Sequence, residues 1–347
     1  MFYAKYKFEI GCKGSNNFAI MQIFGPENDK KMKYITQKEL NELIEQWFKE
    51  DIGDGDHTSL SSIPADAEGC QQLILKDTGI LAGVEVAKAV IEFFDPTLRV
   101  EWFLQDGAAV KPGDIAFRVY GKVRSLLQVE RTMLNIMQRM SGIATMSHRY
   151  QEMVAGTGCT ILDTRKTTPG LRLLEKEAVR IGGAHNHRIG LFDMILLKDN
   201  HVDFAGGTAA AIHRAKEYCK AKGKDLKIEI EVRNRAEIDA ALAEGGIDRI
   251  MLDNFTPEAT REAVQYIRER TPKGQVDWDD LVPNWKKTQP GYVEIESSGG
   301  ITAESLRQYA ECGVDFISVG ALTHSFKCLD MSFKAVKGGA PAQPHSL

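Results

Sequence analysis

The chain has 347 residues, 43% of them hydrophobic, which is long enough for two domains or for one barrel with an added domain. Its 44 basic and 48 acidic residues give a formal net charge of -4, so no global field favours nucleic acid or an anionic membrane surface. Any selectivity for anions must therefore be local.

Six cysteines are scattered along the chain without a CxxC pair. This spacing fits neither a disulfide framework nor a zinc knuckle, and it favours reduced thiols in a cytoplasmic protein. No apolar run approaches the roughly 20 residues that a membrane helix needs. Residues 1–33 lack the apolar core of a signal peptide and the arginines of a transit peptide, so we treat them as an extension without an assigned function.

The first predicted helix lies in TQKELNELIEQWFKED, where Thr36 and Glu39 have the spacing of a capping box and apolar residues recur at helical intervals. A turn-rich segment at residues 51–59 follows. Short β-like runs then alternate with Gly, Pro and Asp turns, and a long helical pattern through RSLLQVERTMLNIMQRM leads onward. We therefore predict an N-terminal α+β domain over residues 34–145.

From Cys159 onward the chain changes to short apolar runs, most of which are followed by a turn and then by helical sequence. Such alternation predicts parallel strands with helices packed outside them. Because the units are too few for a full eight, we predict an incomplete α/β barrel over residues 146–325. We expect the tail, residues 326–347, to pack back on the N-terminal domain. The runs are CTILDT, DMILLKD, KIEIEV, RIMLDN, YVEIESSGG and DFISVGA.

Side chains at the carboxyl ends of barrel strands line the active site. Basic residues outnumber acidic ones between residues 165 and 198, which suits a substrate with several carboxylates or phosphates. For three of these residues at near-helical spacing, a solvated helix face is an equally good interpretation. Those three are Arg172, Lys176 and Arg180, and the others are Arg165, Lys166, Arg188 and Lys198.

KIEIEV places Ile228 and Ile230 on one face of a strand and Glu229 and Glu231 on the other. If the isoleucines meet the outer helices, the glutamates point into the barrel. Buried carboxylates need compensation by cations or by a hydrated divalent ion, which magnesium pyrophosphate would supply. An exposed edge strand with one polar face fits the same pattern equally well. The same alternation groups Asp253 with Met251, and Glu294 with Glu296 and Ser298.

Glycine turns follow the last two predicted strands, at Ser298-Gly299-Gly300 and at Gly320. In barrels these final loops often bind phosphate through backbone N–H groups, although turn geometry alone also explains the glycines. The stretch His185-Asn186-His187 suggests zinc, but no further Cys or His has recognisable spacing, so zinc is the less favoured interpretation.

Residues 164–201, TRKTTPGLRLLEKEAVRIGGAHNHRIGLFDMILLKDNH, resemble the signature block of the quinolinate phosphoribosyltransferase family. The pieces EDIGDGDHTS, GILAGVE, ERTMLNIMQRMSGIAT, IEIEV, MLDN, SSGGI and SVGALTHS occur in the family's order. The resemblance implies an N-terminal α/β sandwich domain followed by an incomplete α/β barrel. The implied reaction joins quinolinate to phosphoribosyl pyrophosphate and gives nicotinate mononucleotide, pyrophosphate and carbon dioxide.

The resemblance also implies a homodimer, or a hexamer built as a trimer of dimers, with active sites shared between subunits. It assigns Arg131 to the partner's site, and it implies that Mg²⁺ arrives with phosphoribosyl pyrophosphate, near Glu231 and Asp253, without a dedicated protein ligand. The implied catalytic residues are Lys166, Lys198, Glu231 and Asp253. The implied substrate-binding residues are these four together with Arg131, Thr164, Arg165, His187, Arg188, Ser298, Gly299, Gly300 and Gly320.

The segment at residues 272–291 is longer than the family usually has, and it predicts a surface loop or an oligomer contact. Three functional alternatives remain: use of nicotinate, a non-catalytic binder of a phosphoribosyl ligand, and a molybdenum-associated homologue. The unbroken HR, RK and KDNH motifs favour quinolinate.

Overall fold

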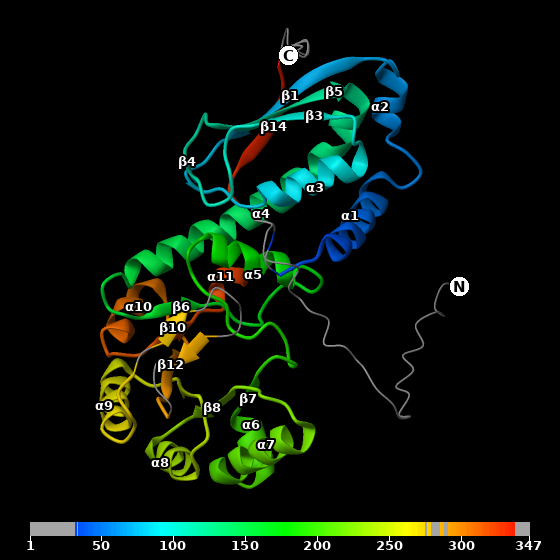
Figure 1. Cartoon of the computed structure of the whole chain (residues 1–347). Coiled ribbons are helices and arrows are strands. Elements are labelled where there is room, and N and C mark those ends of the chain that lie inside the picture. Colours follow the sequence, from blue (N-terminus) through cyan, green and yellow to red (C-terminus); the bar gives the residue numbers. More distant parts are fainter. Residues whose placement is uncertain (1–31, 33, 275, 279–284, 288–290, 337–347) are drawn as a thin grey trace, which may run out of the picture.

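The computed structural model describes residues 32, 34–274, 276–278, 285–287 and 291–336 (Figure 1). The predicted N-terminal extension before Met32 and the PAQPHSL tail lie outside the described residues. Among the described residues, no helix has both the length and the apolar character needed to cross a membrane.

Helix α1 (Gln37–Ile52) begins as predicted. The Thr36 hydroxyl accepts the Glu39 N–H at 3.2 Å, and the Glu39 carboxylate accepts the Thr36 N–H at 2.9 Å. This capping box satisfies two amide groups that a helix start otherwise leaves without partners. The buried face of the helix then packs on α3 (Val84–Phe94), while the short α2 (His57–Ser62) lies against the long helix described below.

The N-terminal domain is built on an antiparallel sheet in the order β14–β1–β5–β3. Three of these strands come from the start of the chain, namely β1 (Glu68–Leu75), β3 (Arg99–Trp102) and β5 (Ile115–Lys122). The fourth, β14 (Met331–Ala335), comes from the end of the described chain and pairs Phe333 with Leu73. Figure 1 shows this red strand among the blue and cyan ones. A small ladder of β2 (Gly79–Ile80) and β4 (Ala109–Val110) lies beside the sheet.

Helix α4 (Val123–Met153) connects the two domains and runs between them (Figure 1). It packs on α3 and β5 in the first domain and on α5 and β6 in the second. Gly142 permits a close approach, because a Cβ there would lie 2.4 Å from the Lys327 carbonyl oxygen. The segment that leads to β14 therefore crosses directly over this helix.

The second domain contains six parallel strands in the order β6–β13–β12–β9–β8–β7. The strands are β6 (Thr160–Leu162), β7 (Ile195–Leu197), β8 (Ile228–Val232), β9 (Arg249–Asp253), β12 (Glu294–Ser298) and β13 (Phe316–Ser318). The helices are α5 (Arg172–Ile181), α6 (Asp199–Ala205), α7 (Thr208–Lys222), α8 (Arg235–Glu244), α9 (Pro257–Arg268), α10 (Ala303–Ala310) and α11 (Ala321–His324). Figure 1 places α7 to α10 outside the strands.

The barrel is incomplete, as predicted. Strands β6 and β7 follow one another in the chain, yet they lie at opposite ends of the sheet. The segment between α5 and β7 is joined to β6 by a single parallel bridge between Leu162 and His185. This leaves an open side, which the chain crosses at about residues 184–194.

Strand β8 lies between β7 and β9 and is buried along its whole length. Ile228 and Ile230 join the hydrophobic core, while Glu229 and Glu231 are 0% and 6% exposed. The alternative of an exposed edge strand is therefore wrong, and the two glutamates belong to the barrel interior and mouth.

In the inserted segment, β10 (Val276–Trp278) and β11 (Trp285–Lys287) pair as a short antiparallel ladder. The sequence analysis did not indicate these two strands, because the segment has no period-two pattern. Its surface position and its role as an oligomer contact stay predictions.

Candidate active site

Lys198, Glu231 and Asp253 stand at the carboxyl ends of three neighbouring strands, β7, β8 and β9. The Lys198 Nζ lies 2.8 Å from the Glu231 Oε2. Asp253 has a raised pKa, because partial burial disfavours its charge and the nearby charge of Glu231 adds to the effect. Two carboxylates with one lysine thus occupy one edge of the mouth.

Arg165 and Arg188 bring two guanidinium groups together at the same end of the barrel. Arg188 is 6% exposed, and its pKa is lowered by burial and then by the charge of Arg165. The Arg165 Nε is buried without a hydrogen-bond partner among the described residues. Two neighbouring cations that share a site favour a bound anion with more than one negative oxygen.

Lys166 and Gly320 converge with a residue that the sequence interpretation missed, His324. A Cβ on Gly320 would lie 2.9 Å from the Lys166 Cδ and 3.1 Å from the His324 Nε2. The Thr323 hydroxyl donates to the Lys166 carbonyl at 2.9 Å and ties the two loops together. The only sequence signal for His324 was its place four residues after Gly320, in SVGALTHS.

The loops after β9 and β12 meet at Asn254 and Gly299. Asn254 is the one described non-glycine residue with a positive φ, at 57°. Its N–H donates to the Ser298 carbonyl at 2.9 Å, and a Cβ on Gly299 would lie 2.3 Å from its side-chain oxygen. Gly299 is therefore required by this approach, whereas Gly300 has open space around its Cβ position. The Thr164 hydroxyl, on the first loop, accepts the Lys166 N–H at 3.0 Å.

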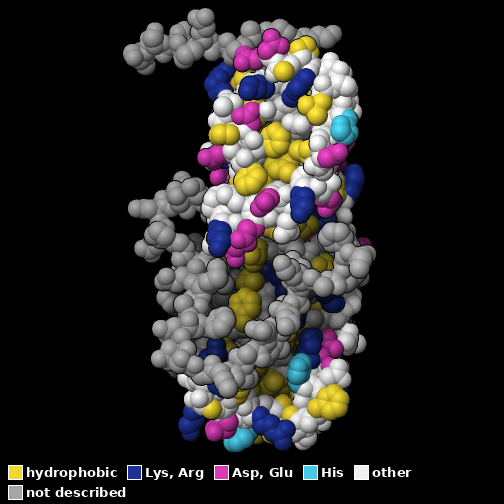
Figure 2. All heavy atoms as spheres, turned by 90° about the vertical axis from the view of Figure 1, so that its right-hand side faces the viewer, with side chains coloured by type: hydrophobic (Ala, Val, Ile, Leu, Met, Phe, Trp, Pro, Cys, Tyr) yellow, Lys and Arg dark blue, Asp and Glu magenta, His cyan; other side chains and the backbone are white. Residues whose placement is uncertain are grey.

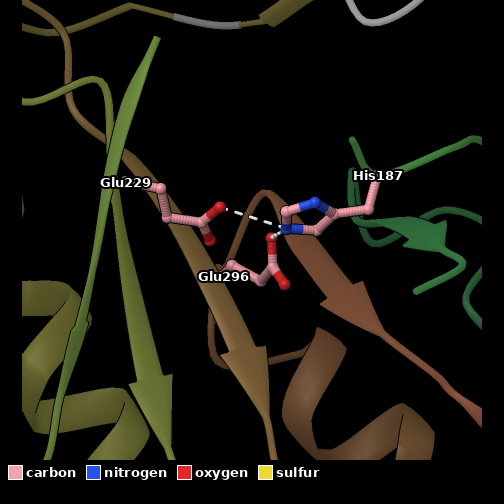
Figure 3. A group of neighbouring side chains, drawn as sticks. All are labelled: His187, Glu229 and Glu296. Carbon is pink, nitrogen blue, oxygen red and sulfur yellow. Dashed lines mark ion pairs between the residues drawn. The ribbon is translucent and has the colours of Figure 1, made fainter. Parts of the chain in front are cut away.

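His187 points into the barrel toward two glutamates from different strands (Figure 3). Its Nε2 lies 3.0 Å from the Glu229 Oε2 and 3.5 Å from the Glu296 Oε2. All three side chains are buried. Arg249 completes the group, with its Nη1 at 2.5 Å from the Glu296 Oε2. His187 and Arg249 outweigh the effect of burial and lower the pKa of Glu296 to about 2.

The three basic residues of α5 have different environments. Lys176 is fully buried, and its Nζ lies 2.5 Å from the Asp163 Oδ1. Arg172 is partly buried and donates to the Thr167 hydroxyl at 2.9 Å. Arg180 is exposed and pairs with Glu177. The alternative of a solvated helix face is therefore wrong for Lys176, because spacing alone cannot show which turn of a helix meets a buried acid.

Arg131 lies apart from this group, on the exposed side of α4. Its helix segment belongs to the N-terminal domain, whereas the remaining predicted residues are on the strand ends and loops of the barrel.

Comparison with known proteins identifies the family of this chain. The chain matches the family model for the N-terminal domain of quinolinate phosphoribosyl transferase over residues 56–141 and the model for its C-terminal domain over residues 143–334. It is 41% identical over 303 residues to the chloroplastic, carboxylating nicotinate-nucleotide pyrophosphorylase of Oryza sativa. This match covers 85% of this chain and 77% of the rice protein.

A probable carboxylating nicotinate-nucleotide pyrophosphorylase of Bacillus subtilis is 38% identical over 295 residues, covering 85% of this chain and 92% of that protein. The solved structure of NadC from Streptococcus pyogenes superposes with a TM-score of 0.77 at 34% identity and covers 87% of this chain and 99% of that one. The chain therefore belongs to the quinolinate phosphoribosyltransferase family.

Proposed function

We propose that this protein transfers the phosphoribosyl group of phosphoribosyl pyrophosphate to the ring nitrogen of quinolinate and releases pyrophosphate and carbon dioxide. The product is nicotinate mononucleotide, a precursor of NAD. The observation that carries the proposal is that Arg165 and Arg188 lie near each other at the same barrel mouth as Glu231 and Asp253. The two arginines suit a planar dicarboxylate. The two carboxylates suit a ribose that becomes positively charged during the reaction.

The two carboxylates of quinolinate are on adjacent ring carbons, so two guanidinium groups side by side can bind both. This leaves the ring nitrogen free to attack the anomeric carbon of the ribose. As the bond to pyrophosphate breaks, positive charge builds on the sugar, and the carboxylates of Glu231 and Asp253 stabilise it electrostatically. Lys198, held by Glu231, is placed to offset the charge of the departing pyrophosphate.

Decarboxylation follows from the charge that the ring has gained. Breaking the bond between the ring and the carboxylate beside the nitrogen sends its electron pair toward the positive ring, and a proton then replaces the lost group. No protein nucleophile takes part in either step, so catalysis depends on positioning and on charges already in place.

Mg²⁺ is expected to enter with the pyrophosphate group and to neutralise part of its charge. Glu231 and Asp253 fit such an ion, because they offer carboxylate oxygens at a partly exposed mouth where a hydrated ion can be accommodated. The 5-phosphate is assigned to the turns after the neighbouring strands β12 and β13, at Ser298, Gly299, Gly300 and Gly320, which offer backbone N–H groups. Lys166 and His324 lie beside Gly320 and add a cation and an imidazole.

We further propose that two copies share each active site, as a homodimer or as a trimer of dimers. Arg131 is exposed one helical turn after Leu127, which is 36% exposed. Figure 2 shows hydrophobic side chains gathered on one face of the N-terminal domain, in its upper half. The barrel exposes its own large apolar residues, Leu191, Phe192 and Phe204, which are 71%, 59% and 91% exposed. Such surfaces are typical of a protein interface.

A cytoplasmic location is part of the proposal, although several plant relatives carry chloroplastic or mitochondrial names. The five described cysteines form no disulfide, which fits a reducing compartment such as the cytoplasm but does not separate it from the interior of those organelles.

The testing experiment supplies purified protein with quinolinate, phosphoribosyl pyrophosphate and Mg²⁺, and measures nicotinate mononucleotide together with released carbon dioxide. Nicotinate is the parallel substrate. Equal amounts of both products from quinolinate, with none of the nucleotide from nicotinate, are expected. Nucleotide formed from nicotinate alone, or binding of quinolinate without turnover, would contradict the proposed reaction.

A further inference from the structure

Arg188 is carried by the segment that crosses the open side of the barrel. A strand inside a sheet is held by hydrogen bonds on both edges, but this segment has a single bridge, from His185 to Leu162. A side chain that must meet a substrate within a fraction of an ångström requires a firmer support than one bridge. Other contacts must therefore fix the segment.

The first support comes from Asp163, at the end of β6. Its carboxylate accepts three hydrogen bonds, from the Lys176 Nζ at 2.5 Å, the Asn186 Nδ2 at 2.6 Å and the His187 N–H at 2.8 Å. Lys176 also donates to the His187 carbonyl at 3.1 Å. All four side chains are buried, so water does not compete for these bonds. The backbone of residues 186 and 187 is thereby fixed to β6 and α5.

The second support is the ring of His187, both of whose nitrogens face groups of the protein. Its Nδ1 accepts the backbone N–H of Arg188 at 2.8 Å, and its Nε2 faces Glu229 and Glu296 across the barrel (Figure 3). The ring thus connects the backbone of Arg188 to strands β8 and β12. This arrangement leaves neither nitrogen directed at the open mouth.

Two effects act on the protonation of this ring. Burial lowers the pKa of His187, but the carboxylates of Glu229 and Glu296 outweigh it and raise the pKa, which favours a proton on the Nε2 that faces them. The backbone contact decides the tautomer, because the Arg188 N–H donates to Nδ1 at 2.8 Å and Nδ1 must keep its lone pair. The ring that fixes Arg188 is therefore protonated on Nε2 alone, toward the two carboxylates.

The same proton argues against a metal ion held by His187, Glu229 and Glu296, although their ligand atoms lie within 4.8 Å of one another. A metal ion would need the Nε2 lone pair, and ligating histidines donate from their second nitrogen, whereas here Nδ1 accepts. Arg249 already supplies a cation to Glu296. Glu229 and Glu296 are therefore better suited to holding the His187 ring in place than to binding a zinc ion together with it.

We propose that Glu229 is a positioning residue for quinolinate binding, acting through His187 on the backbone of Arg188. Its carboxylate orients the imidazole, the imidazole fixes the Arg188 N–H, and the guanidinium is thereby held beside Arg165. The role differs from that of Glu231, two residues farther along the same strand, which faces the lysine at the mouth. This inference rests on the proposed function, because it names quinolinate as the anion that Arg188 binds.

The test uses full-length Glu229→Gln, which keeps the shape of the side chain and removes its charge. The dissociation constant for quinolinate, measured by calorimetry, is expected to rise at least about tenfold. A change of this size corresponds to the loss of one charge-assisted contact. The KM for phosphoribosyl pyrophosphate is expected to stay within about twofold. Glu177→Gln is the matched control, since Glu177 is a buried acid on α5 that pairs outward with Arg180, and it should leave both constants unchanged.

A double-mutant cycle separates positioning from a general structural loss. His187→Gln should weaken quinolinate binding by a similar factor, and the double variant should bind no more weakly than the poorer single one, because both changes break the same link. Should Glu229→Gln fail to fold by thermal unfolding, His187→Gln alone carries the test, with the same selective loss of quinolinate affinity expected.

Additive losses, or quinolinate binding by Glu229→Gln at the wild-type affinity, would overturn the positioning role. Equal losses for both substrates would do the same, since they indicate a distorted barrel rather than a displaced arginine. The proposed function is judged separately, from turnover by the unaltered protein. If that protein converts quinolinate while Glu229→Gln binds it normally, only the positioning inference fails.

Discussion

Lys198 and Glu231 form an ion pair at the barrel mouth, with 2.8 Å between the Nζ and the Oε2, although their exposures differ greatly. The lysine side chain is 48% exposed and the glutamate side chain 7%. The glutamate therefore fixes the lysine, whose free end remains available to a phosphate. Asp253, on the next strand, has a raised pKa, because the side chain is partly buried and the negative charge of Glu231 lies nearby.

Glu231→Gln should lower kcat about a hundredfold, because it removes a preorganised charge that stabilises the developing sugar cation. The KM for quinolinate should change little. The acidic limb of the rate profile should also shift to lower pH, since loss of the Glu231 charge lowers the pKa of Asp253 and keeps it ionised in more acidic solution. Steady-state kinetics between about pH 5 and 9 measure both effects.

Glu244→Gln is the matched control for this change, because Glu244 also pairs with a lysine, Lys216, but lies at the end of α8. Its rate profile should match that of the unaltered protein. An acidic limb that does not move in Glu231→Gln would mean that Asp253 is not the group that titrates there.

Arg131→Ala should raise the KM for quinolinate about tenfold or more, the usual cost of losing a hydrogen bond to a charged group. Its thermal unfolding should be unchanged, because the arginine is exposed. Mixing this variant with an inactive Lys198→Ala variant, followed by subunit exchange, should restore part of the activity if the site is shared. An unchanged KM, or no recovery in the mixture, would contradict a role for Arg131 in the partner's site.

Gly299→Ala should impair phosphoribosyl pyrophosphate binding far more than Gly300→Ala. Both glycines have positive φ, at 95° and 62°, so each substitution carries backbone strain of about 1 kcal/mol or more. Only at Gly299 would the new Cβ also meet Asn254, at 2.3 Å from its side-chain oxygen and 2.9 Å from its backbone nitrogen. The KM for phosphoribosyl pyrophosphate is the measurement, and equal effects of both substitutions would show that this approach does not shape the site.

Local patterns predicted the features that depend on neighbouring residues. Thr36 and Glu39 indicated the start of α1 because a capping box lies within one turn, and the alternation of KIEIEV identified its two acidic side chains. The sequence could not show which partners these acids meet. Glu229 finds His187 from another part of the chain, and β14 finds its register on β1 at Leu73. Such pairings are fixed by tertiary packing, which no local period encodes.

Lys176 is the clearest example of that limit, and it supports a stability prediction. Lys176→Met should destabilise the fold by about 3–5 kcal/mol, because it leaves the Asp163 carboxylate buried without its cation. Arg180→Met, one turn farther along α5, should cost less than Lys176→Met, because the Arg180 guanidinium is exposed, although it also removes a cation that faces the buried Glu177. Denaturant unfolding of both variants gives the comparison. Adding Asp163→Leu to Lys176→Met should recover part of the lost stability, because a buried pair replaced by apolar groups leaves no charge uncompensated. If Lys176→Met is no less stable than Arg180→Met, the buried pair is not what fixes α5 to β6, and the support proposed for the Arg188 segment loses its first anchor.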